Sequence, residues 1–148
     1  MFDLFFDKMY NEYVEKMRIQ RLTPVALAFI GDAVHTLYVR EYLVASYDGV
    51  VGTLHTAASR LVNAKCQAAV MDELTANGVL TPDEEEVAHR AKNAHLHSRA
   101  KAASLTDYHK ATALEAVIGY VHVSGDVERE KQLLELCVKI GTEINSKS

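Results

Sequence analysis

Cysteine is scarce in this sequence. Its 148 residues include two, Cys66 and Cys137, and both fall within apolar patterns of helical spacing. Neither has partners at the short fixed spacing that a zinc site of cysteine and histidine ligands requires. The scarcity argues against a disulfide-stabilised secreted protein, so we expect two reduced thiols in the core of a cytoplasmic protein.

Long apolar runs are also missing. The best one is interrupted by Asp32 and Arg40, so it falls short of the roughly 20 residues that a membrane-spanning helix needs. The segment 1–10 is rich in aromatic residues, but it contains Asp3 and Asp7 and has no basic start. This pattern argues against a secretory signal or a transit peptide, and we expect no association with a membrane.

Positive charge is not in excess. The net charge is −4, which argues against a generally basic nucleic-acid-binding protein, yet the segment 89–110 has a net charge of +4. A positive segment on an acidic body gives a phosphate chain one preferred place to lie. The alternative is a loop whose charges are only solvated. The basic residues of this segment are Arg90, Lys92, Arg99, Lys101 and Lys110.

No segment alternates between apolar and polar residues over a useful length, whereas several follow the helical period. With 49% hydrophobic residues, the chain fits one all-α domain over 1–148, a compact helical bundle. An amphipathic helix over 2–18 is expected to cap the core, and 93–105 is expected to be a loop. Further helices are expected over 24–45, 54–75, 82–91, 106–124 and 127–144.

Capping residues mark the predicted helix ends. Thr23 and Thr81 each precede a proline at the first helical position, and Thr81 also begins a capping box. Thr53 is expected to cap the helix over 54–75. Gly125 is expected to end the helix that precedes it.

Two apolar runs of helix length each contain a single acid, Asp32 in the run 25–39 and Glu115 in the run 111–123. A helix that is apolar all round is a buried helix, and a buried unpaired carboxylate costs several kcal/mol unless it is protonated, hydrogen-bonded or bound to a metal. Two such acids suggest one shared site for a hard cation such as Mg²⁺. The alternative, which spacing leaves open, is that each acid is only hydrogen-bonded or reaches the surface at the edge of a cleft.

These runs resemble a known family. Phe29-Ile-Gly-Asp-Ala-Val34 is similar to the signature hexapeptide of the ribonuclease III catalytic domain, and Leu114-Glu-Ala-Val-Ile-Gly119 to its second acidic motif; Ser59-Arg-Leu-Val-Asn63 resembles the intervening helix. From Leu22 onward the sequence most resembles the Mini-ribonuclease III subfamily, in which the catalytic domain stands alone. The segments that carry this second resemblance are Ala26 to Ala33, Leu54-His55, Ala64 to Ala68 and Arg90 to Ala94.

The resemblance implies a ribonuclease III-type endonuclease domain without a double-stranded-RNA-binding domain. It implies a Mg²⁺-dependent homodimer that cleaves double-stranded RNA to 5′-phosphate ends, and maturation of the large-subunit (23S) ribosomal RNA precursor, where a ribosomal protein could assist. One alternative is a non-catalytic RNA-binding or ribosome-associated protein of the same fold. Another is a helical phosphohydrolase of small nucleotides, which would normally show adjacent His-Asp ligands that this sequence lacks.

Asp32 and Glu115 are the predicted catalytic residues and Mg²⁺ ligands. The wider family has further acids where this chain has Val25, Ala28 and Thr112, which leaves the number of metal ions open. Thr112 shares a helical face with Glu115, so its hydroxyl could hold a metal-bound water.

The predicted RNA contacts combine the resemblance with the charge pattern. They are Arg90, Lys92, Asn93, Arg99 and Lys101, together with Lys65, for which a solvated helix face is an equal alternative. Tyr108, His109 and Lys110 could extend this surface.

Phe29 and Ile30 are the predicted dimer contacts, because the signature helix lies at the dimer seam of the resembled family; the alternative is ordinary core. His35 lies one helical turn from Asp32 and could support it. The sequence assigns no role to His55, His95 or His97, and it leaves the role of His109 open.

Overall fold

The structure, a computed structural model, describes residues 2–16, 18–47, 50–94 and 104–147, and within them it is all-α, as predicted, with no strand. α1 (Phe2–Lys16) and a short 3-10 helix, η1 (Ile19–Arg21), precede the main body. The body consists of α2 (Pro24–Ser46), α3 (Val51–Val62), α4 (Ala64–Ala76), α5 (Pro82–Lys92), α6 (Leu105–Ser124) and α7 (Val127–Ser146).

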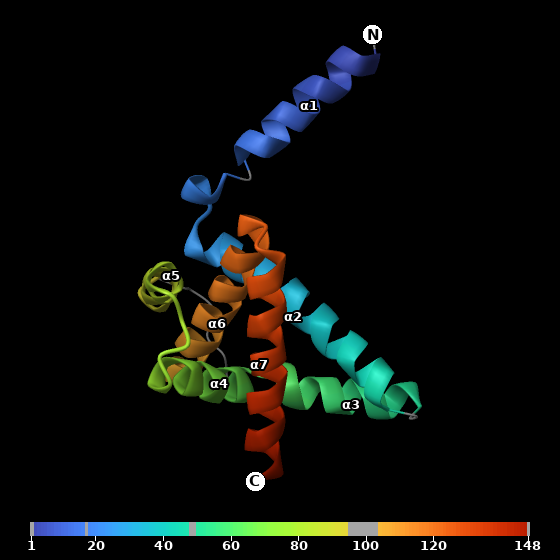
Figure 1. Cartoon of the computed structure of the whole chain (residues 1–148), viewed down its shortest axis with the longest axis vertical. Helices are drawn as coiled ribbons and strands as arrows, with labels where there is room; N and C mark the ends of the chain where they lie inside the picture. Colours follow the sequence, from blue (N-terminus) through green and yellow to red (C-terminus); the bar gives the residue numbers. More distant parts are fainter. Residues whose placement is uncertain (1, 17, 48–49, 95–103, 148) are drawn as a thin grey trace.

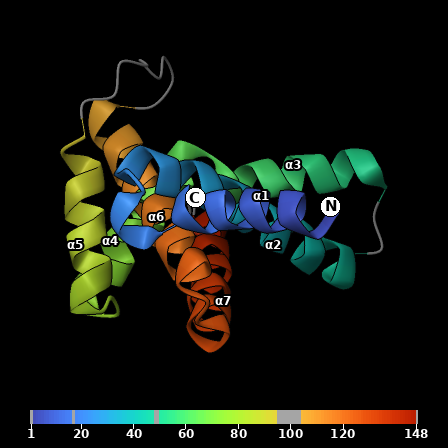
Figure 2. The same ribbon diagram turned by 90° about the horizontal axis from the view of Figure 1, so that it is seen from above.

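α6 is the central helix (Figures 1 and 2). It packs against α2, α4, α5 and α7, and it contributes the fully buried Leu114, Val117 and Ile118 to the main core. A smaller cluster joins the far end of α2 to α3 and α7 through Val39, Leu61 and Val138. Because α6 is covered on several sides, a polar group on it is held in place by several neighbouring helices.

The structure confirms most of the predicted helix ends. The side chain of Thr23 accepts a hydrogen bond from the amide of Ala26 (3.1 Å) at the start of α2. Thr81 and Glu84 form the capping box of α5, with both bonds 3.2 Å long. Gly125 ends α6 with a φ of 76°, a left-handed conformation that glycine adopts without strain.

Glu84 has a second role that the capping pattern did not predict. Its side chain is 3% exposed, and Arg129 of α7 donates to both of its carboxylate oxygens at 2.6 and 2.9 Å. The same guanidinium donates to the carbonyl of Val79 at 2.8 Å. The start of α5 is therefore tied to α7 by a buried ion pair.

The single helix predicted over 54–75 is wrong. Asn63 has an extended backbone (φ −71°, ψ 157°) and separates α3 from α4. Its Oδ1 accepts from the amide of Cys66 at 2.8 Å, while its Nδ2 donates to the carbonyl of Ser59 at 2.9 Å. One asparagine thus caps both helices, and α3 begins at Val51, before the expected cap Thr53.

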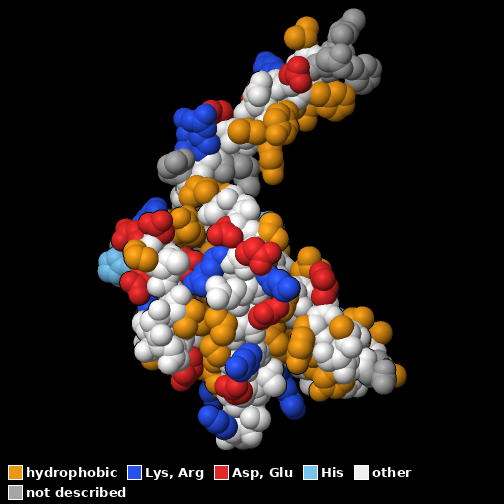
Figure 3. Space-filling view, viewed as in Figure 1, with side chains coloured by type: hydrophobic (Ala, Val, Ile, Leu, Met, Phe, Trp, Pro, Cys, Tyr) orange, Lys and Arg blue, Asp and Glu red, His pale blue; other side chains and the backbone are white. Residues whose placement is uncertain are grey.

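The prediction that the N-terminal helix caps the core is also wrong. α1 projects away from the body (Figure 1), and apolar side chains along it are exposed, among them Leu4, Phe5 and Tyr10. Figure 3 shows these hydrophobic side chains gathered along one side of the helix. The amphipathic pattern was correctly identified, but none of the residues that the structure describes covers its apolar face. No helix in the described ranges combines the length and apolar character needed to cross a membrane.

Candidate active site

The site is built where α2 crosses α6 at two glycines. A Cβ added to Gly31 would lie 1.7 Å from the carbonyl oxygen of Glu115, and a Cβ added to Gly119 would lie 1.9 Å from that of Leu27. Contacts between Cβ and other heavy atoms essentially never fall below 3.0 Å. The two backbones therefore touch here, and Asp32, the residue after Gly31, comes close to Glu115.

The two acids affect one another, as the sequence predicted. Burial, and then the negative charge of Asp32, raise the pKa of Glu115 to about 7, while a hydrogen bond from Gln67 opposes the rise. Like charges held together raise a carboxyl pKa because they disfavour the second ionisation. The structure thus brings both predicted catalytic acids into one electrostatic site.

The expected burial of Asp32 is wrong. Glu115 is half-buried, but Asp32 is exposed, because no described part of the chain packs on the outer face of α2. Apolar neighbours on that helix are exposed as well, including Val25 at 45% and Phe29 at 82%. For Asp32, the alternative of an acid that reaches the surface is the observed one.

Two further residues lie behind Glu115. Sequence reasoning did not place Gln67 in the site, whereas it considered His35 as a support for Asp32. Gln67 of α4 and His35 of α2 are both 2% exposed. The Nε2 of Gln67 lies 3.1 Å from Nδ1 of His35, and Gln67 also donates to the Glu115 carboxylate. Burial lowers the pKa of His35 to about 4, so its ring is neutral at physiological pH. A polar residue inside the apolar stripe of α4 was the signal that could have identified Gln67.

The donor set fits a hard divalent cation. Mg²⁺ prefers oxygen ligands, and proteins usually bind it through one or two carboxylates while it keeps several waters. Among the described residues no group of three or more metal-ligating side chains occurs, so Asp32 and Glu115 are the acids available. The positions of the other family acids hold the exposed Val25 and the buried Ala28.

Thr112 is a further polar residue of α6, three positions before Glu115. It is buried, and its hydroxyl donates to the carbonyl of Tyr108 at 2.9 Å. A hydroxyl oxygen that donates its proton can still accept hydrogen bonds. Thr112 is therefore able to accept a hydrogen bond from a water, but it adds no charge.

The predicted RNA-contact residues that the structure describes lie on α4 and at the end of α5. Arg90 and Asn93 are exposed at the end of α5, Lys92 is half-buried there, and Lys65 is exposed on α4. Asn93 also contacts His89 at 3.2 Å. Arg99 and Lys101, like His95 and His97, lie outside the described residues.

The flanking residues of α6 are held by other contacts. Nδ1 of His109 donates to the carbonyl of Lys92 at 2.7 Å and so ties α6 to the end of α5. Lys110 pairs with Asp72 at 2.9 Å, which neutralises part of its charge. A pocket of about 280 Å³ nevertheless brings Lys92, His109 and Lys110 together.

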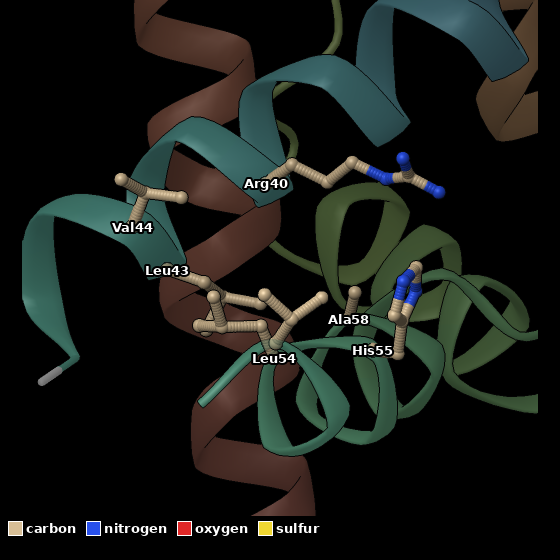
Figure 4. A pocket seen from close by; sticks show the side chains of 7 residues that line it. Arg40, Leu43, Val44, Leu54, His55 and Ala58 are labelled. Carbon is tan, nitrogen blue, oxygen red and sulfur yellow. The ribbon is translucent and has the colours of Figure 1, made fainter. Parts of the chain in front are cut away.

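Phe29 and Ile30 differ in exposure. Phe29 is 82% exposed and Ile30 is half-buried, so Phe29 is not an ordinary core residue. His55 lies elsewhere, in a pocket of about 260 Å³ between α2 and α3 (Figure 4). Its lining is otherwise mostly apolar and includes neither acid.

Comparison with known proteins identifies the class. Residues 25–126 match the family model of the ribonuclease III domain, the segment that begins within α2 and includes both acids. A solved structure of a protein from Fusobacterium nucleatum shares the fold with a TM-score of 0.72 and 29% identity, over 82% of this chain and 95% of that one.

Relatives narrow the class further. The Mini-ribonuclease 3 of Enterococcus faecalis is 38% identical over 86% of this chain and 97% of its own length. That of Brevibacillus brevis is 43% identical over 76% of this chain and 82% of its own. The chain belongs to the ribonuclease III family, in its Mini-ribonuclease 3 group, and is an endoribonuclease.

Proposed function

We propose that the chain is a Mg²⁺-dependent endoribonuclease that cleaves double-stranded RNA at Asp32 and Glu115, leaving 5′-phosphate and 3′-hydroxyl ends. The observation that carries this proposal is the glycine crossing of α2 and α6. It holds two carboxylates so close that the charge of one raises the pKa of the other. A divalent cation between them would relieve this repulsion.

The two acids are expected to have different roles because they differ in exposure to solvent. Asp32 lies at the solvent edge, where a substrate phosphate can approach, and Glu115 lies behind it, fixed by Gln67. Mg²⁺, held by these two carboxylates, would polarise the phosphoryl oxygen, stabilise the leaving alkoxide and activate a water for in-line attack. Thr112, whose hydroxyl donates to a backbone carbonyl, would accept a hydrogen bond from a water at this site.

RNA binding is proposed along the end of α5 and the segment that follows it. Arg90, Lys92 and Asn93 would contact phosphates together with Arg99 and Lys101, and Lys65 would add a contact from α4. Such contacts position the RNA backbone without reading its sequence. The proposed substrate is a large-subunit ribosomal RNA precursor in the cytoplasm, on which a ribosomal protein could assist.

A homodimer follows from the number of acids. One chain supplies a single Asp32 and a single Glu115, and therefore one active site. Cutting both strands of a duplex needs two active sites, related by the same two-fold symmetry as the two strands. A two-fold dimer provides that relation. The exposed Phe29 precedes Asp32 by three residues on α2, and the half-buried Ile30 follows Phe29, so we propose that these residues contact the second copy.

Cleavage of double-stranded RNA tests the proposal. The wild-type chain should cleave with Mg²⁺ and stop when a chelator is added. Asp32→Asn and Glu115→Gln keep the shape of each side chain but remove its charge, so each should abolish cleavage while leaving the fold and RNA binding intact. The control is Glu128→Gln, an exposed acid at the start of α7, which should cleave like the wild type.

Two outcomes would contradict the proposal. Mg²⁺-dependent cleavage that survives in either acid variant would refute the site. A wild-type chain that binds double-stranded RNA without cutting it under any divalent cation would favour the non-catalytic RNA-binding alternative.

A further inference from the structure

Gln67, His35 and Glu115 form a hydrogen-bonded series across three helices. Gln67 lies on α4, His35 on α2 and Glu115 on α6, so residues far apart in sequence meet behind the site. Both Gln67 and His35 are 2% exposed, so water does not compete for the bond between them.

The chemistry of the two side chains fixes the direction of the bond between them. The Nε2 of a glutamine is an amide nitrogen that donates two hydrogens and accepts none. Its contact with Nδ1 of His35 at 3.1 Å therefore requires a lone pair on Nδ1, which places the single ring proton on Nε2. The remaining amide hydrogen of Gln67 is free for the Glu115 carboxylate, whose pKa a hydrogen bond from Gln67 lowers.

This arrangement sets the orientation of the amide. If Gln67 were turned over, its carbonyl oxygen would face the carboxylate of Glu115, and two acceptors would oppose each other. The carboxylate of Glu115 and a lone pair on Nδ1 of His35 together favour the opposite orientation, because only the NH₂ group can donate to both. His35 thus acts on Glu115 through Gln67, to which its ring is hydrogen-bonded.

We propose that Gln67 is a positioning residue for Glu115, and that the neutral ring of His35 orients its amide so that the carboxylate is held ready for a divalent cation. The proposal rests on the function proposed above, in which Glu115 is a ligand. Groups that orient metal ligands typically contribute about 10- to 100-fold to metal affinity or activity. We expect an effect of that size here.

Mg²⁺ binding to the metal-free full chain, without RNA, tests the proposal directly. Mg²⁺ is titrated in and the backbone amide NMR signals around Gly31 and Gly119 are followed. Gln67→Leu and His35→Leu should each weaken Mg²⁺ binding by about 10- to 100-fold. Because both act through one amide, the double variant should be no weaker than either single variant.

Two further variants separate positioning from packing. His35→Asn presents an acceptor oxygen as many bonds from the backbone as Nδ1, and should restore Mg²⁺ binding to within a few-fold of wild type. Thr75→Val removes a different hydrogen bond of α4, from Thr75 to the carbonyl of Met71, and should leave Mg²⁺ binding unchanged. If a leucine variant does not fold, Gln67→Met keeps the length of the side chain without its donor and takes its place.

Activity and ring tautomer give independent measurements. In the Gln67 variant the Mg²⁺ concentration for half-maximal cleavage should rise by the same factor, while the KM for RNA at saturating Mg²⁺ stays constant. Nitrogen-15 shifts of the His35 ring in the wild-type chain should show the proton on Nε2.

The proposal is overturned by a protonated Nδ1, by wild-type Mg²⁺ binding in Gln67→Leu or Gln67→Met, or by additive effects of the two leucine substitutions. Its failure is distinguishable from failure of the proposed function. If only the positioning role of Gln67 is wrong, Asp32→Asn and Glu115→Gln will still abolish cleavage. If the proposed function is wrong, these two variants will still cleave RNA.

Discussion

Replacing Gly119 by alanine should force α2 and α6 apart. The new Cβ would lie 1.9 Å from the carbonyl oxygen of Leu27, a backbone atom that no side-chain rotation can move away. Reaching the 3.0 Å minimum of Cβ contacts requires the helices to separate by about 1 Å. Overpacking of this kind costs roughly 1–3 kcal/mol, and a clash with backbone favours the upper end.

The net loss of stability can be worked out from two opposing effects. Alanine is favoured over glycine within a helix by about 1 kcal/mol, so the free energy of unfolding should fall by roughly 2 kcal/mol. For a chain of this size that corresponds to a drop in Tm of roughly 4–8 °C. Because the same movement separates Asp32 from Glu115, cleavage should fall by up to about 100-fold, the loss that a displacement of about 1 Å can cause.

Thermal unfolding and cleavage of double-stranded RNA measure the two effects. The control is Gly52→Ala in α3, where an added Cβ meets no atom within 4 Å, so this variant should lose neither stability nor activity. A Gly119→Ala chain as stable and as active as the wild type would refute the idea that backbone contact sets the spacing of the acids.

Three further predictions concern the ion pair, the dimer and the RNA surface. Burial on its own raises the pKa of Glu84, but hydrogen bonds and the charge of Arg129 outweigh it and hold the pKa below its usual 4.5. The ion pair should therefore stabilise the fold above about pH 4.5. This contribution should be lost as the pH falls through the lowered pKa. Arg129→Met should cost about 3 kcal/mol at neutral pH, a difference from wild type that narrows towards acid in urea unfolding experiments. Phe29→Glu should convert a dimer to monomers in sedimentation experiments and leave the helix content unchanged; an unaltered sedimentation coefficient would place the interface elsewhere. Replacing Arg90 and Lys92 by alanine should weaken RNA binding equally for all sequences and reduce the salt slope by roughly 0.9 for each RNA phosphate that is no longer neutralised, whereas an unchanged slope would show that these charges are only solvated.

Much of the fold could be predicted because its signals are local. The caps at Thr23, Thr81 and Gly125 act within one helical turn, so the sequence alone identifies them. Asn63 is also a local signal, but it lies within a continuous apolar stripe that is typical of one long helix. Periodicity therefore concealed a boundary that only the hydrogen bonds of its side chain establish.

The candidate site was predicted in part, for a related reason. Single acids in apolar runs indicated Asp32 and Glu115, and in the structure the charge of the first acts on the second. Periodicity could not separate residues that face the core from those that face the surface, so Asp32 was expected to be buried. Gln67 and His35 were not assigned to each other because their contact depends on how α2 and α4 pack.

The shared cap at Asn63 links the two parts of the core in local unfolding. Its side chain satisfies the last turn of α3 and the first turn of α4, and its carbonyl accepts from the amide of Gln67 at 3.0 Å. α3 belongs to the smaller cluster and α4 to the main one, so neither helix end can fray without removing a partner from the other. Opening of α3 should thus expose the amide of Cys66 to hydrogen exchange together with its own amides, and a loosening that begins far from the acids reaches the helix that orients one of them.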